Sequence, residues 1–155
     1  MTEIAPLFTA FNFHVSILLG DAGDPLCDAA FAECAGLEMS MAVTTIREGG
    51  SNGAPVHLTG PVSYANLTLK RGMSRRLDLW NWMERVARDD ERSLRATCEV
   101  EMLAADRTGP VAVFVLTGCL PVKLKAPALN AQTGMVAIEE LEIVYQTMSL
   151  RAGGG

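Results

Sequence analysis

Short segments in which apolar and polar residues alternate recur along most of this chain, and they constrain its fold more than any other feature. Successive side chains of a β-strand point to opposite faces, so a period of two places one set in a core and the other in solvent. Clear alternation is found in residues 11–19, 37–43, 64–70, 94–102 and 120–124. Residues 111–116 are apolar throughout, which indicates a strand covered on both faces. Residues 135–148 read as a last strand with a phase change near Glu139.

One segment has helical periodicity instead. The apolar side chains of residues 74–90 recur at helical spacing and include Trp80 and Trp82. Ser74 is suited to cap the helix N-terminus. The sequence therefore predicts one amphipathic helix over residues 74–90, with both tryptophans packed or half-packed against a sheet.

Residues 48–61 interrupt the alternation with glycine and proline. A loop of this length is uncommon in a compact domain and is usually functional or disordered. The phase of the preceding strand slips at residues 44–46, as a β-bulge would produce. Residues 37–70 therefore predict an extended hairpin-like unit, and Met39 and Met41 at period two are expected to face the core.

These elements predict a mainly β (α+β) fold: a small antiparallel β-barrel or sandwich of about seven strands, with one flanking helix and the long loop at 48–61. A chain of 155 residues suits one domain. We expect residues 1–10 to be an N-terminal arm and residues 151–155 a flexible tail. No apolar run reaches the ~20 residues of a membrane span. Without a signal-like N-terminus, synthesis in the cytoplasm is expected.

Composition argues against several kinds of binding site. With 13 basic and 18 acidic residues the net charge is −5, which disfavours specific nucleic-acid recognition. The four cysteines lack Cys-x-x-Cys spacing, and only His14 and His57 could join them as ligands. We expect reduced, buried thiols, no metal and no cofactor.

No catalytic constellation is evident. A Gly-x-Ser-x-Gly elbow is missing, and the 49–53 segment lacks the lysine and following helix of a phosphate loop. Glu139, Glu140 and Glu142 are the densest acidic group, and paired carboxylates can perform acid–base chemistry. No nucleophilic or basic motif accompanies them, so a solvated or interface face is favoured and the protein is expected not to be an enzyme.

Several short segments are informative through their order and spacing. They are residues 31–38 (Phe-x-Glu-x-x-Gly-Leu), 47–50 (Arg-Glu-Gly-Gly), 67–72, 79–82, 121–123, 129–131 and 137–142. Together, from Phe11 to Leu150, they resemble the tail-tube (inner tube) protein family of contractile phage tails and phage-derived contractile injection systems. One departure lies at residues 118–121, which read Gly-Cys-Leu-Pro where the family often has Asn-Ala-Trp-Pro.

The resemblance implies a single tail-tube domain over residues 1–155 and a structural role. Family members form hexameric rings that stack into a hollow conduit, which a contracting sheath drives through a target envelope. The implied partners are other copies of the chain, the sheath protein, baseplate or tube-initiator and tail-terminator proteins, and cargo in the lumen. The implied location is a phage tail or tail-like particle, assembled in the cytoplasm and then released or membrane-anchored.

On this interpretation the glycine-rich loop joins subunits, within a ring or between stacked rings, because glycines allow positive φ and close backbone approach. The residues expected at this interface are Arg47, Glu48, Gly49, Gly50, Asn52 and Gly53. Residues 111–116 are a second interface candidate. Candidate inter-subunit charge pairs involve Arg75, Arg76, Glu139 and Glu142. Candidate lumen-facing residues are Asn66, Thr68 and Lys70.

Other functions stay open at this point. One is a monomeric ligand-binding β-barrel in which the loop is a lid. A second is a hydrolase that uses Glu139 or Glu140. The two closer alternatives are a tube-initiator paralogue near the baseplate and the secreted tube protein of type VI secretion.

Overall fold

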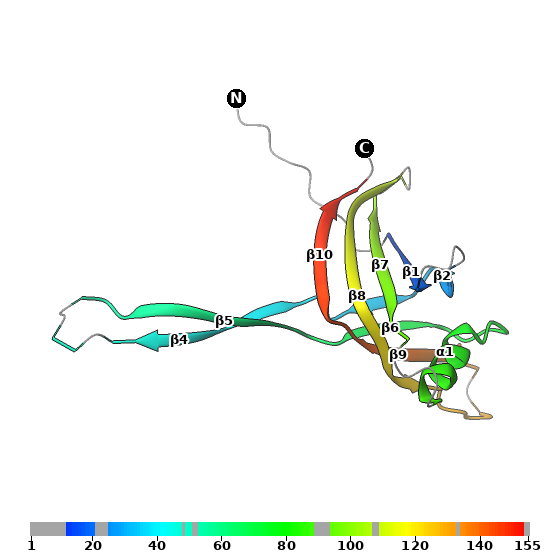
Figure 1. The fold of residues 1–155 in the computed structure, drawn as a ribbon. Helices are drawn as coiled ribbons and strands as arrows, with labels where there is room; N and C mark the ends of the chain where they lie inside the picture. Colours follow the sequence, from blue (N-terminus) through cyan, green and yellow to red (C-terminus); the bar gives the residue numbers. More distant parts are fainter. Residues whose placement is uncertain are drawn as a thin grey trace.

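The computed structural model describes residues 12–20, 25–47, 49–50, 53–88, 94–106, 109–132 and 134–153. The expected N-terminal arm, and Glu48 and Asn52 of the expected interface loop, lie outside these ranges. The described part is built from antiparallel strands with one helix (Figure 1). The mainly β prediction is confirmed.

One long strand, β8 (Pro110–Lys125), organises the fold because its two halves belong to different layers. Its first half pairs with β7 (Ala96–Leu103) on one side and β10 (Thr147–Ala152) on the other. Its second half pairs with β9 (Ile138–Val144). The strand therefore carries the chain from one layer into the other.

The remaining strands extend the two layers outward from β8. On the first, β1 (Phe13–Leu19) pairs with β7, and β2 (Cys27–Ala29) pairs with β1. On the second, β6 (Leu67–Gly72) pairs with β9, and β3 (Glu33–Ala35) pairs with β6. Among the described residues this path of strands is open, ending at β2 and β3, so the fold is sandwich-like and not a closed barrel.

A glycine explains why β8 is one strand where the pattern predicted two, at 111–116 and 120–124. Gly118 has φ +66°, and a Cβ placed there would lie 2.5 Å from Oε1 of Gln146. A glycine tolerates this left-handed conformation without the steric cost of a side chain. The apolar pattern is therefore interrupted at a bend and not at the end of a strand.

The core fills the space between the layers and confirms most of the predicted inward faces. Its fully buried members include Val15, Ile17, Leu67, Leu69, Leu79, Trp82, Cys98, Leu116, Leu141 and Ile143. Cys27, Cys98 and Cys119 are buried free thiols, as expected, whereas the free thiol of Cys34 is only half-buried. Burial raises the pKa of the Cys119 thiol to about 12, so it stays protonated at neutral pH.

The helix α1 (Asp78–Ala87) is shorter than the predicted 74–90. Ser74 does not cap it; the Ser74 Oγ accepts a hydrogen bond from the backbone N–H of Arg76 at 3.3 Å, in the segment before the helix. Arg75 and Arg76 therefore precede the first turn, where the helix dipole would disfavour them, and both are exposed. The tryptophan prediction is confirmed, because Trp82 is fully buried and Trp80 half-buried.

The C-terminal segment also differs from its prediction. The strand expected at 135–148 is divided into β9 and β10, with the chain turning between them at residues 145–146. Arg151 and Ala152 pair with Val113 and Ala112, so these two residues are part of a sheet and not of a flexible tail. No helix in the described ranges is long and apolar enough to cross a membrane.

Candidate subunit interface

A two-stranded ribbon, here called the arm (residues 39–64), projects far from the body (Figure 1). It consists of β4 (Met39–Ile46) and β5 (Val56–Tyr64), which pair only with each other among the described strands. The loop predicted at 48–61 is therefore too long, because residues 56–61 belong to β5. Nine extended residues span roughly 30 Å, so the arm reaches well beyond its own domain.

A bulge bends the arm near its middle. The register shifts between Met41 and Val43, where Ala42 faces the Gly60-Pro61 pair of β5. The predicted bulge is confirmed, although it lies nearer the body than residues 44–46. A Cβ at Gly60 would lie 3.2 Å from the Ala42 Cβ, so glycine gives the strands room to pair closely. Pro61 is tolerated there because bulges leave backbone N–H groups unpaired.

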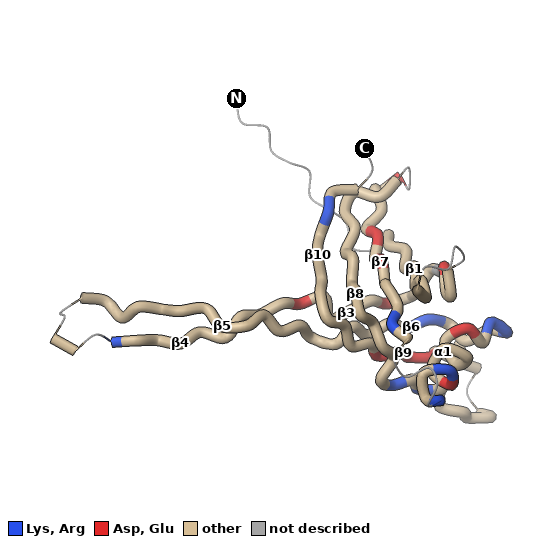
Figure 2. Tube along the Cα trace, viewed as in Figure 1, with Lys and Arg blue, Asp and Glu red and all other residues tan. Residues whose placement is uncertain are grey.

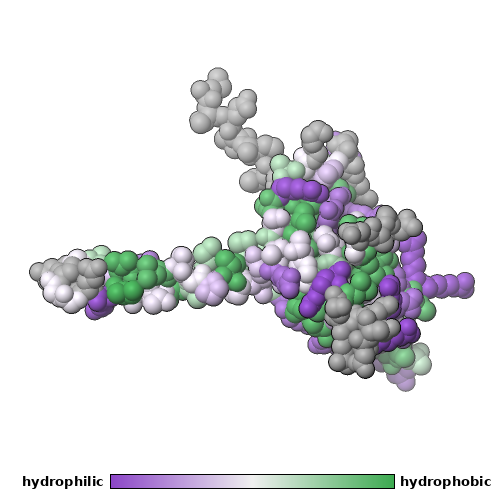
Figure 3. Space-filling model, viewed as in Figure 1, coloured by the Kyte–Doolittle hydropathy of each residue, from purple (hydrophilic) through white to green (hydrophobic). Residues whose placement is uncertain are grey.

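The arm exposes large apolar side chains that sequence periodicity assigned to the core. Their exposed fractions are 51% for Met39, 53% for Met41, 59% for Val43, 44% for Ile46, 48% for Val56, 48% for Leu58 and 40% for Val62. The prediction that Met39 and Met41 face the core is wrong, because both are exposed in the single chain. Figure 3 shows apolar surface along the arm out to its distal part.

The apolar groups occupy both faces of the ribbon. Cross-strand partners share a face, so Met41 lies beside Val62 near the body. Nearer the tip, Ile46 pairs with Val56. Ile46 and Met41 are an odd number of positions apart on β4, and successive side chains of a strand alternate between faces, so this pair lies on the opposite face. Polar pairs complement them, such as Ser40 Oγ and Ser63 Oγ at 2.9 Å.

Charge is almost missing from the arm. In its described residues the one charged side chain among Lys, Arg, Asp and Glu is Arg47, although 20% of the whole chain is charged (Figure 2). Exposed apolar surface of this extent, with so little charge, marks an interaction site. A solitary two-stranded ribbon is also only marginally stable in water, so contact with another surface would stabilise it.

The predicted interface residues that are described lie at the distal part of the arm. Arg47, Gly49, Gly50 and Gly53 are all exposed. Gly50 has φ +88°, so the positive φ expected of this glycine-rich segment is found at one of its members. The arm thus brings these residues together at a site remote from their own core.

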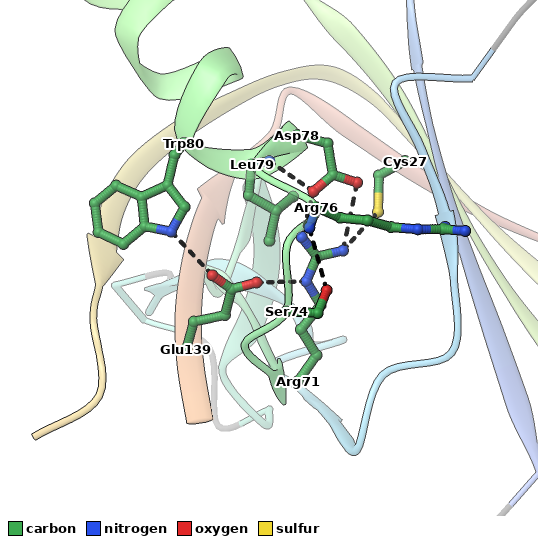
Figure 4. Close-up of polar contacts among 8 residues, drawn as sticks. All are labelled: Cys27, Arg71, Ser74, Arg76, Asp78, Leu79, Trp80 and Glu139. Atoms are coloured by element: carbon green, nitrogen blue, oxygen red, sulfur yellow. Dashed lines mark hydrogen bonds and ion pairs between the residues drawn. The ribbon is translucent and has the colours of Figure 1, made fainter. Parts of the chain in front are cut away.

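A buried polar cluster lies at the other end of the body, where β6, β9 and α1 meet (Figure 4). Arg71 Nε donates to Glu139 Oε1 at 2.5 Å, and the same guanidinium binds the Asp78 carboxylate. Trp80 Nε1 donates to Glu139 Oε2 at 2.9 Å. Arg71 also lies over the Phe31 ring, 5.5 Å from its centroid. Glu139 is 1% exposed, so its predicted inter-subunit charge pair is wrong: both of its oxygens are used within the chain.

The pKa of Asp78 makes this cluster sensitive to acid. Burial alone would raise the pKa of this carboxyl, but hydrogen bonds and the charge of Arg71 outweigh burial and lower it below the ordinary 3.8. A depressed folded-state pKa contributes stability above the unfolded-state value, and this contribution is lost as the pH falls through the folded-state value.

We therefore expect Asp78→Asn to be less stable than the wild type at neutral pH, and the difference to shrink as the pH falls from about 5 to about 3. Urea unfolding across this range measures it. Glu84→Gln, which removes an exposed acid of the same helix, is the matched control and should show no such convergence. A difference for Asp78→Asn that stays constant with pH would contradict the assignment.

Two of the predicted lumen-facing residues have side-chain partners within the chain. Asn66 Nδ2 donates to Glu142 Oε1 at 2.6 Å, and Lys70 Nζ lies 3.3 Å from Glu33 Oε2. Thr68 stands opposite Glu142 in the β6–β9 ladder. Their placement toward a lumen, and that of Glu142, Arg75 and Arg76 toward another subunit, stay predictions.

A second exposed apolar surface was missed by the sequence reasoning. It lines an open groove of about 850 Å³ formed by residues 127–131 and 135–138 between β8 and β9. Leu129 is 92% exposed, Met135 83% and Val136 76%. We call it the β8–β9 groove. Residues 126–138 contain no charged side chain, and this run of 13 uncharged positions was the available signal.

The chain is similar to a family of known proteins. The family model described as "T4-like virus tail tube protein gp19" matches residues 9–149. No curated protein sequence gives a significant match.

Solved structures give three informative similarities. A chain of the anti-feeding prophage (AFP) baseplate has 28% identity and a TM-score of 0.83, with 96% of this chain and 98% of that chain covered. A chain of the extracellular contractile injection system PVC sheath–tube complex has 18% identity and a TM-score of 0.77, covering 94% and 92%. A type six secretion system protein has 13% identity and a TM-score of 0.53, covering 94% and 91%.

Proposed function

This chain belongs to the T4-like virus tail tube protein gp19 family, and on that premise we propose that its copies form hexameric rings stacked into the hollow inner tube of a contractile phage tail or contractile injection system. It is a structural tube subunit. We also infer that residues 1–155 act as one tail-tube domain, synthesised and assembled in the cytoplasm.

The arm is the observation that carries this proposal. It presents seven large apolar side chains that are at least 40% exposed, on both faces of a ribbon that has left its own core. Such a surface is unfavourable in a monomer in water and is covered when neighbouring copies pack around it. In this role Arg47, Gly49, Gly50 and Gly53 contact an adjacent subunit, within the ring or in the next ring.

The polar cluster supports a non-enzymatic role. Glu139, one of the two glutamates considered for acid–base chemistry, is 1% exposed and accepts hydrogen bonds from Arg71 and Trp80. A general base must reach a substrate proton within hydrogen-bond distance, and a carboxylate buried in this way is out of reach of a substrate in solution. We propose that the cluster holds α1 against the sheets.

The similar structures suggest partners. Their descriptions name a baseplate, a sheath–tube complex and a tube-terminating cap. We propose sheath, baseplate and terminator proteins as the partners of this chain, with cargo in the lumen. A tube-initiator position next to the baseplate is a second candidate, since identity is 28% to the baseplate chain and 18% to the chain of the sheath–tube complex.

Purification followed by analytical ultracentrifugation and negative-stain electron microscopy tests the proposal. Rings with a central channel, growing into tubes at high protein concentration, are the expected result. A protein that stays monomeric at all concentrations would contradict it and favour the ligand-binding alternative.

A further inference from the structure

Two exposed apolar surfaces of this chain lie at opposite ends of the molecule. The arm projects to one side, whereas the segment between β8 and β9 lies beyond the end of β8, on the far side of the body (Figure 1). The arm therefore cannot fold back onto the β8–β9 groove of its own chain. Any contact between these two surfaces must join two different molecules.

The two surfaces match in chemistry. The arm carries Val43, Val56 and Leu58 at 48% exposure or more, and the groove carries Leu129, Met135 and Val136 at 76% or more. Apart from Arg47 and Glu48, residues 39–64 and 126–138 contain no Lys, Arg, Asp or Glu. Burying either surface against a charged partner would leave charges desolvated, so each is best covered by an uncharged apolar surface.

Most of the residues that line the groove are exposed, so a segment of another molecule can reach them. The arm is a narrow ribbon of roughly 30 Å, and the groove is an open depression of about 850 Å³. Met135 of the groove can adapt to an inserted ribbon, because the methionine side chain is flexible and unbranched. Hydrogen bonding ties the groove to the body, since the Met73 backbone N–H donates to the Ala137 carbonyl at 2.8 Å.

We propose that the arm of one copy docks in the β8–β9 groove of another copy. This inference rests on the proposed tube function and deepens it by naming the acceptor surface. Contact between two unlike surfaces of one chain is heterologous, so it propagates from copy to copy and either closes a ring or extends a stack. The groove is then a subunit interface and not a site for the sheath or for cargo.

Site-specific photocross-linking tests the proposal. Leu58 is replaced by p-benzoylphenylalanine, and the labelled protein is co-assembled with isotopically heavy wild-type chains. After irradiation and trypsin digestion, we expect cross-links from the arm to the heavy peptide 126–151, centred on Met135. Cross-links confined to other heavy peptides would overturn this proposal and leave the tube function standing. Failure of the wild-type chain to assemble would overturn both.

Charge reversal gives an independent readout. Met135→Glu alone should raise the concentration needed for assembly by about tenfold or more. Combining it with Leu58→Lys should restore assembly, because the two new charges would be paired across the contact. Val122→Glu, at a 47% exposed position outside both surfaces, is the control and should leave assembly unchanged. No rescue in the double variant, together with cross-links elsewhere, would place the arm on a different surface.

Discussion

Val56→Lys is expected to abolish tube formation while leaving the domain folded. Val56 lies on the arm and is 48% exposed, so the monomer accommodates a lysine there at little cost. In an assembled tube the same ammonium group would be buried in an apolar contact without a partner, repeatedly along every ring. Electron microscopy should show no tubes, and the free energy of unfolding should change by no more than about 0.5 kcal/mol.

The chain offers a closely matched control for this variant. Val122 is 47% exposed and lies on the body, so Val122→Lys makes the same chemical change at the same exposure. It should assemble as the wild type does. Deleting residues 49–54 at the end of the arm should also block stacking while preserving the fold. Long tubes from either arm variant would show that the arm does not join subunits.

Glu139→Ala is expected to have the largest effect on folding stability. Its side chain and that of Arg71 are 1% and 7% exposed, and removing one partner of a buried pair costs about 3–5 kcal/mol. Trp80 also loses the acceptor of its indole N–H. The free energy of unfolding of a typical domain is about 5–15 kcal/mol, so this loss should leave the variant close to unfolding. Urea unfolding at neutral pH measures the loss.

The adjacent glutamate separates burial from charge. Glu140 is half-buried and stands opposite Lys70 and Lys125 in the sheet. Glu140→Ala removes the same charge without emptying the cluster, and it should cost no more than about 1 kcal/mol. Equal losses for the two variants would mean that the Arg71 cluster adds nothing specific to the fold.

The alternation of apolar and polar residues predicted much of the core, because the core residues contact one another within a single chain. Val15, Leu67 and Val100 lie on predicted inward faces and are buried. The same rule failed for Met39 and Met41. A period of two shows which residues share a face of a strand, but not whether that face meets the chain's own core or stays exposed. The error therefore fell on the arm, the candidate interface.

Other features had no local signal. Arg71 and Glu139 are 68 positions apart in the sequence. No local motif could therefore predict that Glu139 is the buried partner of Arg71. The groove residues lie in a connection without strand or helix period, and periodicity cannot assign such residues a face. The sequence pattern is interrupted at Gly118, and this interruption predicted the end of a strand. A bend within a strand interrupts the alternation in the same way as a strand end does.

A cryo-electron microscopy reconstruction of the assembled protein would show directly whether the arm joins subunits. We expect a hollow tube in which residues 39–64 of every subunit are buried against neighbouring copies, with Val56 and Leu58 removed from solvent. A tube in which the arm stays free of neighbouring subunits, or a protein that never forms rings, would contradict it.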